Sequence, residues 1–330
     1  MNPNDKPYDF VLFPDGSPER RSGDGHHRFD AERLSGVLDL DLVAHRPVQV
    51  ASGFLDVLQV KGQDVVVARE VTVRGSVRVI PGSSLKGAVR SLVEALSPSC
   101  VRVTGWRSRS AAPRRLNPCS RVDALCPACR LFGMSGRGRE NYAGQVGCED
   151  AVMVDGKIVL VRVPLLWAPA RGRRGLPARY LEGREAKGRK FYFHGKPARG
   201  PDARIAAGTG SVFRARFHFA NLTDGEMGLL LVALGQHPEY PFLLKIGAAK
   251  PVGLGSVEVR VRRITFLGDL RRSGRAGGGE VLESPELREK MRRWMEAAAS
   301  ENLLNREALE EVWSILRQET LTRTAPEGPY

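Results

Sequence analysis

The chain has 330 residues, which suits one domain with insertions or two domains. Hydrophobic residues make up 42% and charged residues 27%, a globular composition that can bury a core. No run of about 18 apolar residues occurs, and the polar start lacks the apolar region of a secretion signal. We therefore exclude a membrane span and expect a cytoplasmic protein with no membrane partner.

Positive charge is the most informative feature of the composition. Lys and Arg number 51 against 37 Asp and Glu, and the net charge of +14 attracts polyanions. The charge is clustered in residues 102–121, with six arginines and no acid, and in residues 170–200, with ten basic residues and two acids. Neither stretch has an amphipathic helical pattern, which favours a nucleic acid over a membrane. The alternative is a basic surface that only maintains solubility.

The first third of the chain predicts an irregular arm, two strands and a helix. Residues 1–35 are polar, with proline and glycine, and we expect an irregular arm there. Residues 34–50 and 64–79 alternate apolar with polar side chains, as strands do. Pro81-Gly82 then indicates a turn, and a helical apolar stripe runs to residue 96, with Ser83 or Ser84 as its expected N-cap.

The remaining elements complete an α+β pattern. Residues 98–145 are loop-rich and contain four cysteines, and residues 168–208 form a long basic insertion. We expect strands over 145–166 (with a turn at Asp155-Gly156), 212–219 and 256–266, and helices over 226–235, after Ser284-Pro285 and after Asn305. The order β, helix, β, β, helix, β is the ferredoxin-like pattern. We expect an arm over 1–35, a core domain over 36–270, a linker over 271–279, and helices within 280–330.

The start of the first helix is a candidate phosphate site. A helix N-terminus presents unpaired N–H groups and a partial positive charge. Ser83 and Ser84 add hydroxyl donors, and Lys86 and Arg90 lie four residues apart on one helix face. These four residues are candidate RNA-backbone contacts, although many capped helices bind nothing.

Two glycine-rich loops are further candidates for binding a polyanion. Glycines allow close approach to backbone N–H donors, so Gly247, Lys250, Gly253 and Gly255 are candidate contacts. The alternative for this loop is a tight hairpin turn. The second loop follows the cysteines and suits a single strand, with a surface loop as its alternative. Its candidate contacts are Arg130, Ser135, Arg137 and Arg139.

Four of the five cysteines have the spacing of a metal site. Cys126 and Cys129 form a Cys-x-x-Cys pair, which suits two ligands of one tetrahedral zinc, and Cys119 and Cys100 can complete the site. His26 or His27 can replace Cys100, and buried thiols without metal are the alternative. Cys148 lies in a predicted strand and is expected to be a buried thiol. No water-activating Glu with a matching His motif occurs, so we expect a structural zinc rather than a catalytic one.

Together these motifs resemble the RAMP superfamily of CRISPR-associated proteins, and most of all the backbone, or seventh-family, subunit of type III effector complexes. The resemblance rests on Ile80-Pro81-Gly82-Ser83-Ser84-Leu85-Lys86-Gly87, Cys129-Arg130-Leu131-Phe132-Gly133, Gly210-Ser211-Val212-Phe213 and the loop over 247–255. Their order covers residues 34–266. Residues 7–11 and 188–194 are similar to RAMP proteins of the type III-D kind.

The resemblance implies an RRM-like, ferredoxin-like core with a zinc-binding insertion, a thumb-like hairpin insertion and a C-terminal helical extension. It implies that copies or paralogues stack as a filament along a guide RNA (crRNA), together with other CRISPR effector subunits. The thumb, expected within residues 168–200 or in part of the cysteine region, would kink the duplex of guide and complementary target RNA. The protein would read backbone shape, while base pairing reads sequence.

Some family members also cut target RNA with an aspartate and a divalent metal, Mg or Mn. The resemblance places Asp64 at that position, and Asp56 is the alternative. Two further possibilities remain open. The subunit can bind RNA while a partner cuts it, or the chain can be a stand-alone RNA-processing endonuclease, for which His237 is the nearest candidate base.

Overall fold

The structure is a computed structural model of the chain. It describes residues 6–58, 66–101, 112–136, 140–166, 181–183, 185–268 and 279–325.

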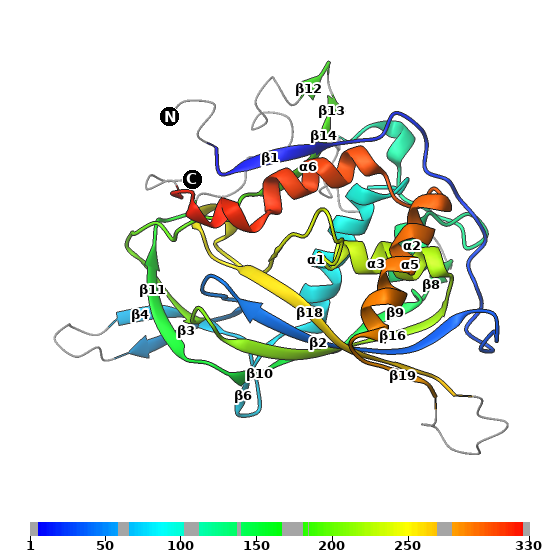
Figure 1. Cartoon of the computed structure of the whole chain (residues 1–330). Coiled ribbons are helices and arrows are strands. Elements are labelled where there is room, and N and C mark those ends of the chain that lie inside the picture. Colours follow the sequence, from blue (N-terminus) through cyan, green and yellow to red (C-terminus); the bar gives the residue numbers. More distant parts are fainter. Residues whose placement is uncertain are drawn as a thin grey trace.

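A nine-stranded antiparallel sheet crosses the middle of the molecule (Figure 1). Its main strands run in the order β17-β18-β2-β16-β10-β6-β5, while β19 pairs with β18 and β9 pairs with β16. In that order the main strands are β17 (Leu244–Lys245), β18 (Ser256–Phe266), β2 (Leu34–Ala44), β16 (Val212–Leu222), β10 (Ala151–Asp155), β6 (Val77–Ile80) and β5 (Val73–Arg74), and the two side strands are β19 (Val281–Leu282) and β9 (Val146–Cys148).

Apolar and acidic side chains alternate along β2, which explains why one face of this sheet is covered. Leu38, Leu40 and Leu42 are buried, while Asp39 and Asp41 between them belong to the opposite face. The predicted strand over 34–50 is confirmed for Leu34–Ala44.

The helices gather on the covered face (Figure 1). They are α1 (Gly82–Leu96), α2 (Pro127–Phe132), α3 (Asp224–Ala233), α5 (Glu286–Ser300) and α6 (Arg306–Leu316). α3 is buried from Gly225 to Ala233 and packs against α1 and α5. A Cβ at Gly228 would lie 1.9 Å from the Trp294 carbonyl oxygen, so glycine is what allows α3 and α5 to approach closely.

A second, four-stranded sheet lies at one end of the molecule. Its order is β11 (Ile158–Val163), β15 (Asp202–Ala207), β4 (Val66–Val71) and β3 (Ala51–Leu58), and β15 and β4 are parallel. The predicted turn at Asp155-Gly156 falls at the end of β10, where Gly156 has φ 121° and begins a two-residue connection. It carries the chain from β10 in the large sheet to β11 in the second sheet rather than closing a hairpin.

Three two-stranded sheets complete the fold. β1 (Tyr8–Leu12) pairs with β14 (Gly188–Tyr192), β12 (Leu181–Glu182) with β13 (Glu185–Ala186), and β7 (Met134–Ser135) with β8 (Asn141–Tyr142). β1 runs beside α6 (Figure 1), and the Leu12 N–H donates to Glu311 at 2.7 Å. The expected irregular arm is therefore partly ordered, because its apolar residues pair with a distant strand.

The helix starts agree only partly with the prediction. The N-cap of α1 is Pro81, without a side-chain hydrogen bond, so the expected cap at Ser83 or Ser84 is wrong. The carboxylate of Asp150 accepts the Gly82 N–H at 2.7 Å in place of a local cap. The start of α6 is confirmed, because Asn305 accepts the Ala308 N–H at 2.9 Å. Among the described residues, no helix has both the length and the apolar character needed to cross a membrane.

Candidate metal centre and nucleic-acid interface

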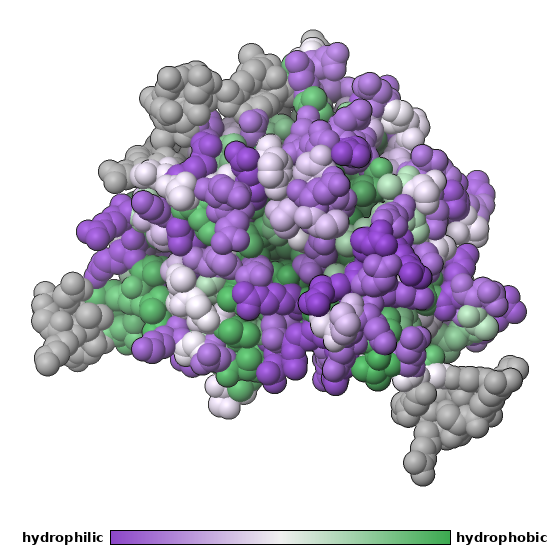
Figure 2. All heavy atoms as spheres, viewed as in Figure 1, coloured by the Kyte–Doolittle hydropathy of each residue, from purple (hydrophilic) through white to green (hydrophobic). Residues whose placement is uncertain are grey.

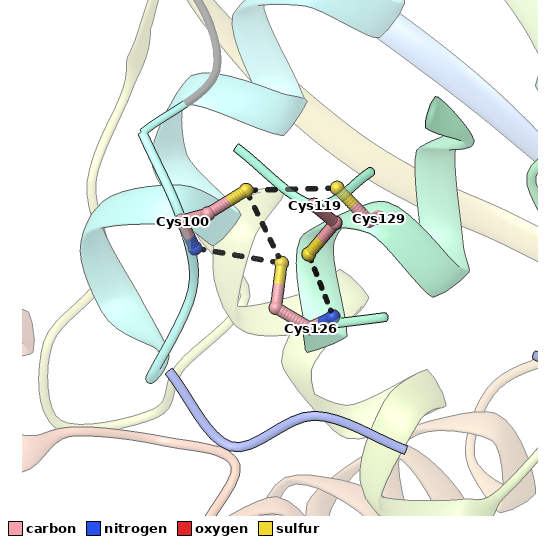
Figure 3. Close-up of side chains that lie close together, drawn as sticks. All are labelled: Cys100, Cys119, Cys126 and Cys129. Atoms are coloured by element: carbon pink, nitrogen blue, oxygen red, sulfur yellow. Dashed lines mark hydrogen bonds between the residues drawn. The ribbon is translucent and has the colours of Figure 1, made fainter. Parts of the chain in front are cut away.

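The four cysteines predicted as ligands meet in one buried cluster (Figure 3). Cys100 follows α1, Cys119 lies in the connection to α2, and Cys126 and Cys129 bracket the first turn of α2. Their sulfur atoms all lie within 4.8 Å of one another. Cys148 lies outside this cluster on β9, where burial raises the pKa of its thiol to about 12.

The geometry of the cluster fits a tetrahedral metal ion and does not fit a disulfide. The sulfur of Cys100 lies 3.6 Å from that of Cys129 and 3.5 Å from that of Cys126. Zinc with bonds of about 2.3 Å separates its thiolate ligands by roughly 3.8 Å, whereas a disulfide bond is about 2 Å long. The residues present therefore fit zinc.

Backbone amides around the cluster favour thiolate sulfur. The N–H of Cys100 donates to Cys126 Sγ at 3.4 Å, and the N–H of Cys126 donates to Cys119 Sγ at 3.3 Å (Figure 3). Hydrogen bonding within the cluster, with Cys100 first and then with Cys119 and Cys129, holds the pKa of Cys126 well below its usual value and raises the pKa of Cys100. Backbone N–H donors thus favour the thiolate form of Cys119 and Cys126.

Neither histidine of the N-terminal arm joins the cluster. His26 is exposed, and its Nε2 lies 2.7 Å from the carbonyl oxygen of Ala143. His27 is likewise exposed and is absent from the ligand group. Cys100 is therefore the fourth member, as one of the two predicted arrangements requires.

The start of α1 is only partly open to a phosphate. Ser83 is exposed and Ser84 is half-buried. Lys86 is half-buried, its Nζ donates to the Val146 carbonyl at 3.0 Å, and burial lowers the pKa of its amine. Because the Asp150 carboxylate already accepts the Gly82 N–H, the exposed serine edge is the part of this site that can meet a polyanion.

Arg130 was expected on a surface loop, and this expectation is wrong. Arg130 lies on α2 in the core, 5% exposed, where it forms an ion pair with Glu226 at 2.7 Å. The same Glu226 side chain completes a capping box with Thr223 at the start of α3. Ser135 is exposed on β7, and Arg137 and Arg139 lie outside the described residues.

The glycines of the loop over 247–255 serve the protein's own packing. All three candidate glycines have positive φ. A Cβ at Gly247 would lie 2.3 Å from the Gln49 carbonyl oxygen, and one at Gly255 would lie 2.0 Å from that of Ile246. A Cβ at Gly253 would lie 2.7 Å from the Lys196 carbonyl oxygen. Close approach is therefore required inside the chain, which is a sufficient reason for glycine here.

Lys245 and Lys250, beside this loop, are buried and half-buried, and neither has a carboxylate partner among the described residues. Lys250 is half-buried, and burial lowers the pKa of its amine. Lys245, on β17, is 8% exposed, and its Nζ donates to Ser256 Oγ at 3.3 Å. Burial, and then the charges of Lys250 and Arg46, lower the pKa of Lys245 to about 7. The sequence over 242–246 did not predict that the side chain of Lys245 would be buried.

The open face of the large sheet carries arginines that the motif search missed. The side chains of five arginines on β16 and β18 are 46–59% exposed and lie around Asp39 and Asp41 of β2, with pairs such as Arg263–Asp39 at 2.8 Å. We call this set the arginine face: Arg214, Arg216, Arg260, Arg262 and Arg263. Period-two alternation in residues 213–219 could have revealed Arg214 and Arg216 on β16.

The candidate catalytic residues do not form a metal site within the described residues. Asp64 lies outside them. Asp56 lies on β3, where its Oδ1 accepts the N–H of Val57 at 2.8 Å. Among the described residues, only the four cysteines form a group of three or more side chains that could hold a metal. His237 Nδ1 accepts the Tyr240 N–H at 3.2 Å, a local contact that fixes a turn.

The second sheet ends in an exposed apolar surface. Phe54, Leu55 and Val57 of β3 and Val67 of β4 are 55–74% exposed. Figure 2 shows this surface as green atoms at the end of the molecule where β3 and β4 lie.

Comparison with known proteins finds a family and a distant likeness to a solved structure. A family model described as the RAMP superfamily matches residues 60–258, more than half of the chain. Among solved structures, the chain is similar to one titled Type IV-B CRISPR Complex, with 16% sequence identity and a TM-score of 0.36, covering 68% of this chain and 90% of that chain. No curated protein matches the chain.

Proposed function

Because the chain belongs to the RAMP superfamily, we propose that it is a guide-RNA-binding subunit of a CRISPR effector complex. The observation that carries the proposal is the family match over residues 60–258, which includes both the α1 motif and the glycine-rich loop. The net charge of +14 supports a polyanionic partner. The other subunits of the complex and a complementary target RNA are its remaining partners in this proposal.

The finer assignment is the backbone subunit of a type III complex, in which copies stack along the guide. The sequence motifs at 80–87 and 247–255 and the III-D-like residues 188–194 support it. The order β18-β2-β16-β10, with α1 following β2 and α3 following β16 along the chain, supports a ferredoxin-like core. Within this proposal, the cysteine region and the basic region over 168–208 are insertions into that core.

The proposed resident metal is one structural zinc, held by Cys100, Cys119, Cys126 and Cys129. When bound, zinc cross-links the end of α1 to α2 and neutralises thiolate charge inside the core. The residues themselves supply the N–H···S hydrogen bonds and the shielding from water.

The sharpest test of the function is the RNA that copurifies with the protein. The protein should be purified from a host carrying its own repeat array, and the bound RNA sequenced. We expect guide-length species derived from the repeats. Random cellular RNA of mixed length would contradict the proposal and indicate only non-specific polyanion binding.

The exposed serine edge of α1 is the first candidate for the RNA contact. Ser83→Asp places a negative charge where a phosphate would lie, while an acid in the first turn favours the helix itself. We therefore expect guide-RNA affinity to fall about tenfold or more with an unchanged melting temperature. Fluorescence anisotropy with labelled guide RNA measures the affinity.

Two comparison variants locate the surface. Ser314→Asp adds the same charge to an exposed position of α6 and should leave the affinity within about twofold. If Ser83→Asp also has no effect, the combined variant R214Q, R216Q and R260Q tests the arginine face. A loss of salt slope of about 0.7 for each lost phosphate contact in that variant would move the RNA to the open sheet.

Cleavage of target RNA is proposed as a second activity and assigned to Asp64 with Mg or Mn. Asp64→Ala should abolish metal-dependent cleavage at regular spacing and leave guide binding intact, because the carboxylate would hold the metal and not the guide. Asp56→Ala tests the alternative assignment and should leave cleavage intact; loss of cleavage in this variant alone would move the catalytic role to Asp56. Gel analysis of labelled target RNA measures cleavage by both variants. Continued cutting by the Asp64→Ala protein would refute the assignment.

A further inference from the structure

Arg90, predicted as an RNA contact, points instead at the cysteine cluster. Its Nη2 donates to Cys129 Sγ at 3.3 Å, its Nη1 donates to the Gly133 carbonyl at 2.7 Å, and its Nε donates to Glu94 at 2.8 Å. Hydrogen bonds from one planar guanidinium therefore join α1 to the second cysteine of the Cys-x-x-Cys pair and to the C-cap of α2 at Gly133.

A second arginine extends this contact to another part of the chain. Glu94 is 4% exposed, and its other oxygen accepts a hydrogen bond from Arg189 of β14. The sequence of contacts is thus Cys129, Arg90, Glu94 and Arg189. We call the last three residues the guanidinium relay.

The net charge of the guanidinium relay favours a negatively charged neighbour. Among the described residues, the ion pairs join two arginines to one glutamate, which leaves one uncompensated positive charge on side chains that are only 3–16% exposed. Buried charge of this kind is costly unless a neighbour compensates it. Four neutral thiols would not compensate it, whereas a divalent ion with four thiolates carries a net charge of −2.

We propose that Arg90 is a positioning residue of the metal centre, which donates a hydrogen bond to the metal-bound thiolate of Cys129 and fixes the cluster to α1. The proposal rests on the metal centre proposed above. It also removes Arg90 from the set of RNA contacts and makes the register of α1, which carries the candidate serine edge, dependent on the occupied cluster.

The test is metal affinity and spectroscopy on the full chain. Arg90→Gln removes the donor to sulfur and the positive charge, and we expect the affinity for Zn²⁺, measured by competition with a chromogenic chelator, to fall 10–100-fold. With Co²⁺ in the site, the thiolate-to-metal charge-transfer band should shift to lower energy, because the sulfur loses a hydrogen bond. A general loss of packing would not produce that shift with an unchanged tetrahedral d–d spectrum.

Two control variants show whether the effect of Arg90→Gln comes from the lost hydrogen bond to sulfur. Arg189→Gln breaks the outer pair with Glu94 without touching sulfur, and it should leave the Co²⁺ band in place. Arg90→Lys keeps the charge and serves if Arg90→Gln does not fold; it should restore part of the affinity but not the full band energy. Unchanged Zn²⁺ affinity and band energy in the folded Arg90 variant would overturn the proposal.

A measurement of RNA binding distinguishes failure of the Arg90 proposal from failure of the proposed RNA-binding function. The Arg90 variants should bind guide RNA with the wild-type salt slope when zinc is saturating, whereas a lost phosphate contact would reduce the slope. Absence of metal from wild-type protein would refute the proposed metal centre itself. A reduced slope with normal zinc affinity would return Arg90 to the RNA interface.

Discussion

Replacing Cys126 and Cys129 together with serine is expected to abolish cooperative folding, not merely to remove one ion. All four cysteines are at most 2% exposed and belong to the main hydrophobic core. Structural zinc contributes about 10–16 kcal/mol in small zinc domains, which matches or exceeds the net stability of about 5–15 kcal/mol that most domains have. Two buried serine hydroxyls would add a further cost of about 1–3 kcal/mol each.

The measurements are zinc content and thermal unfolding followed by circular dichroism. Wild-type protein should contain about one zinc per chain, and a strong chelator should reproduce the loss of the unfolding transition seen in the double variant. Cys148→Ser is the matched control, because Cys148 lies outside the cluster. It should keep the zinc and lose no more than about 2 kcal/mol. A double variant that melts like the wild type would show that the cysteines are only packed thiols.

The cysteine cluster was predictable because its strongest signal is local. Cys126 and Cys129 are separated by one helical turn, so their spacing alone brings two sulfurs together. The choice of Cys100 over a histidine was not predictable, because it depends on where α1 ends relative to α2. That arrangement is set by core packing between residues far apart in sequence.

The surroundings of the candidate nucleic-acid contacts were harder to predict, because they too depend on packing between distant residues. A basic residue in a glycine-rich stretch has the same local pattern whether it faces solvent or the core. Arg130 is in the core because Glu226, 96 residues away, offers it a carboxylate. The exposed alternation of β16 was available in the sequence, but its meaning depended on knowing that the opposite face is covered by helices.

Lys245→Met is expected to stabilise the protein at neutral pH. The pKa of Lys245 is lowered to about 7 in the folded chain, against about 10.4 for an unfolded lysine. Between these two values the unfolded chain binds more protons, so the wild-type protein loses stability as the pH falls from about 10 to 7 and levels off below 7. Three units of pKa correspond to about 4 kcal/mol. The methionine variant removes this loss but also the hydrogen bond to Ser256, which leaves a gain of about 2–3 kcal/mol at pH 7.

Urea unfolding at several pH values between 7 and 10 measures this difference. The advantage of Lys245→Met should shrink as the pH rises toward 10. The lysine of the unfolded chain then loses its proton as well, so folding no longer has to remove it. Buried His194 also contacts Ser256, but burial lowers its pKa to about 3, so it stays neutral across this range and does not confuse the profile. Lys196→Met, at an exposed lysine, should change the unfolding free energy by no more than about 0.5 kcal/mol. A Lys245→Met protein less stable than wild type at pH 7 would mean that a negative group compensates this lysine, contrary to its surroundings of Arg46 and Lys250.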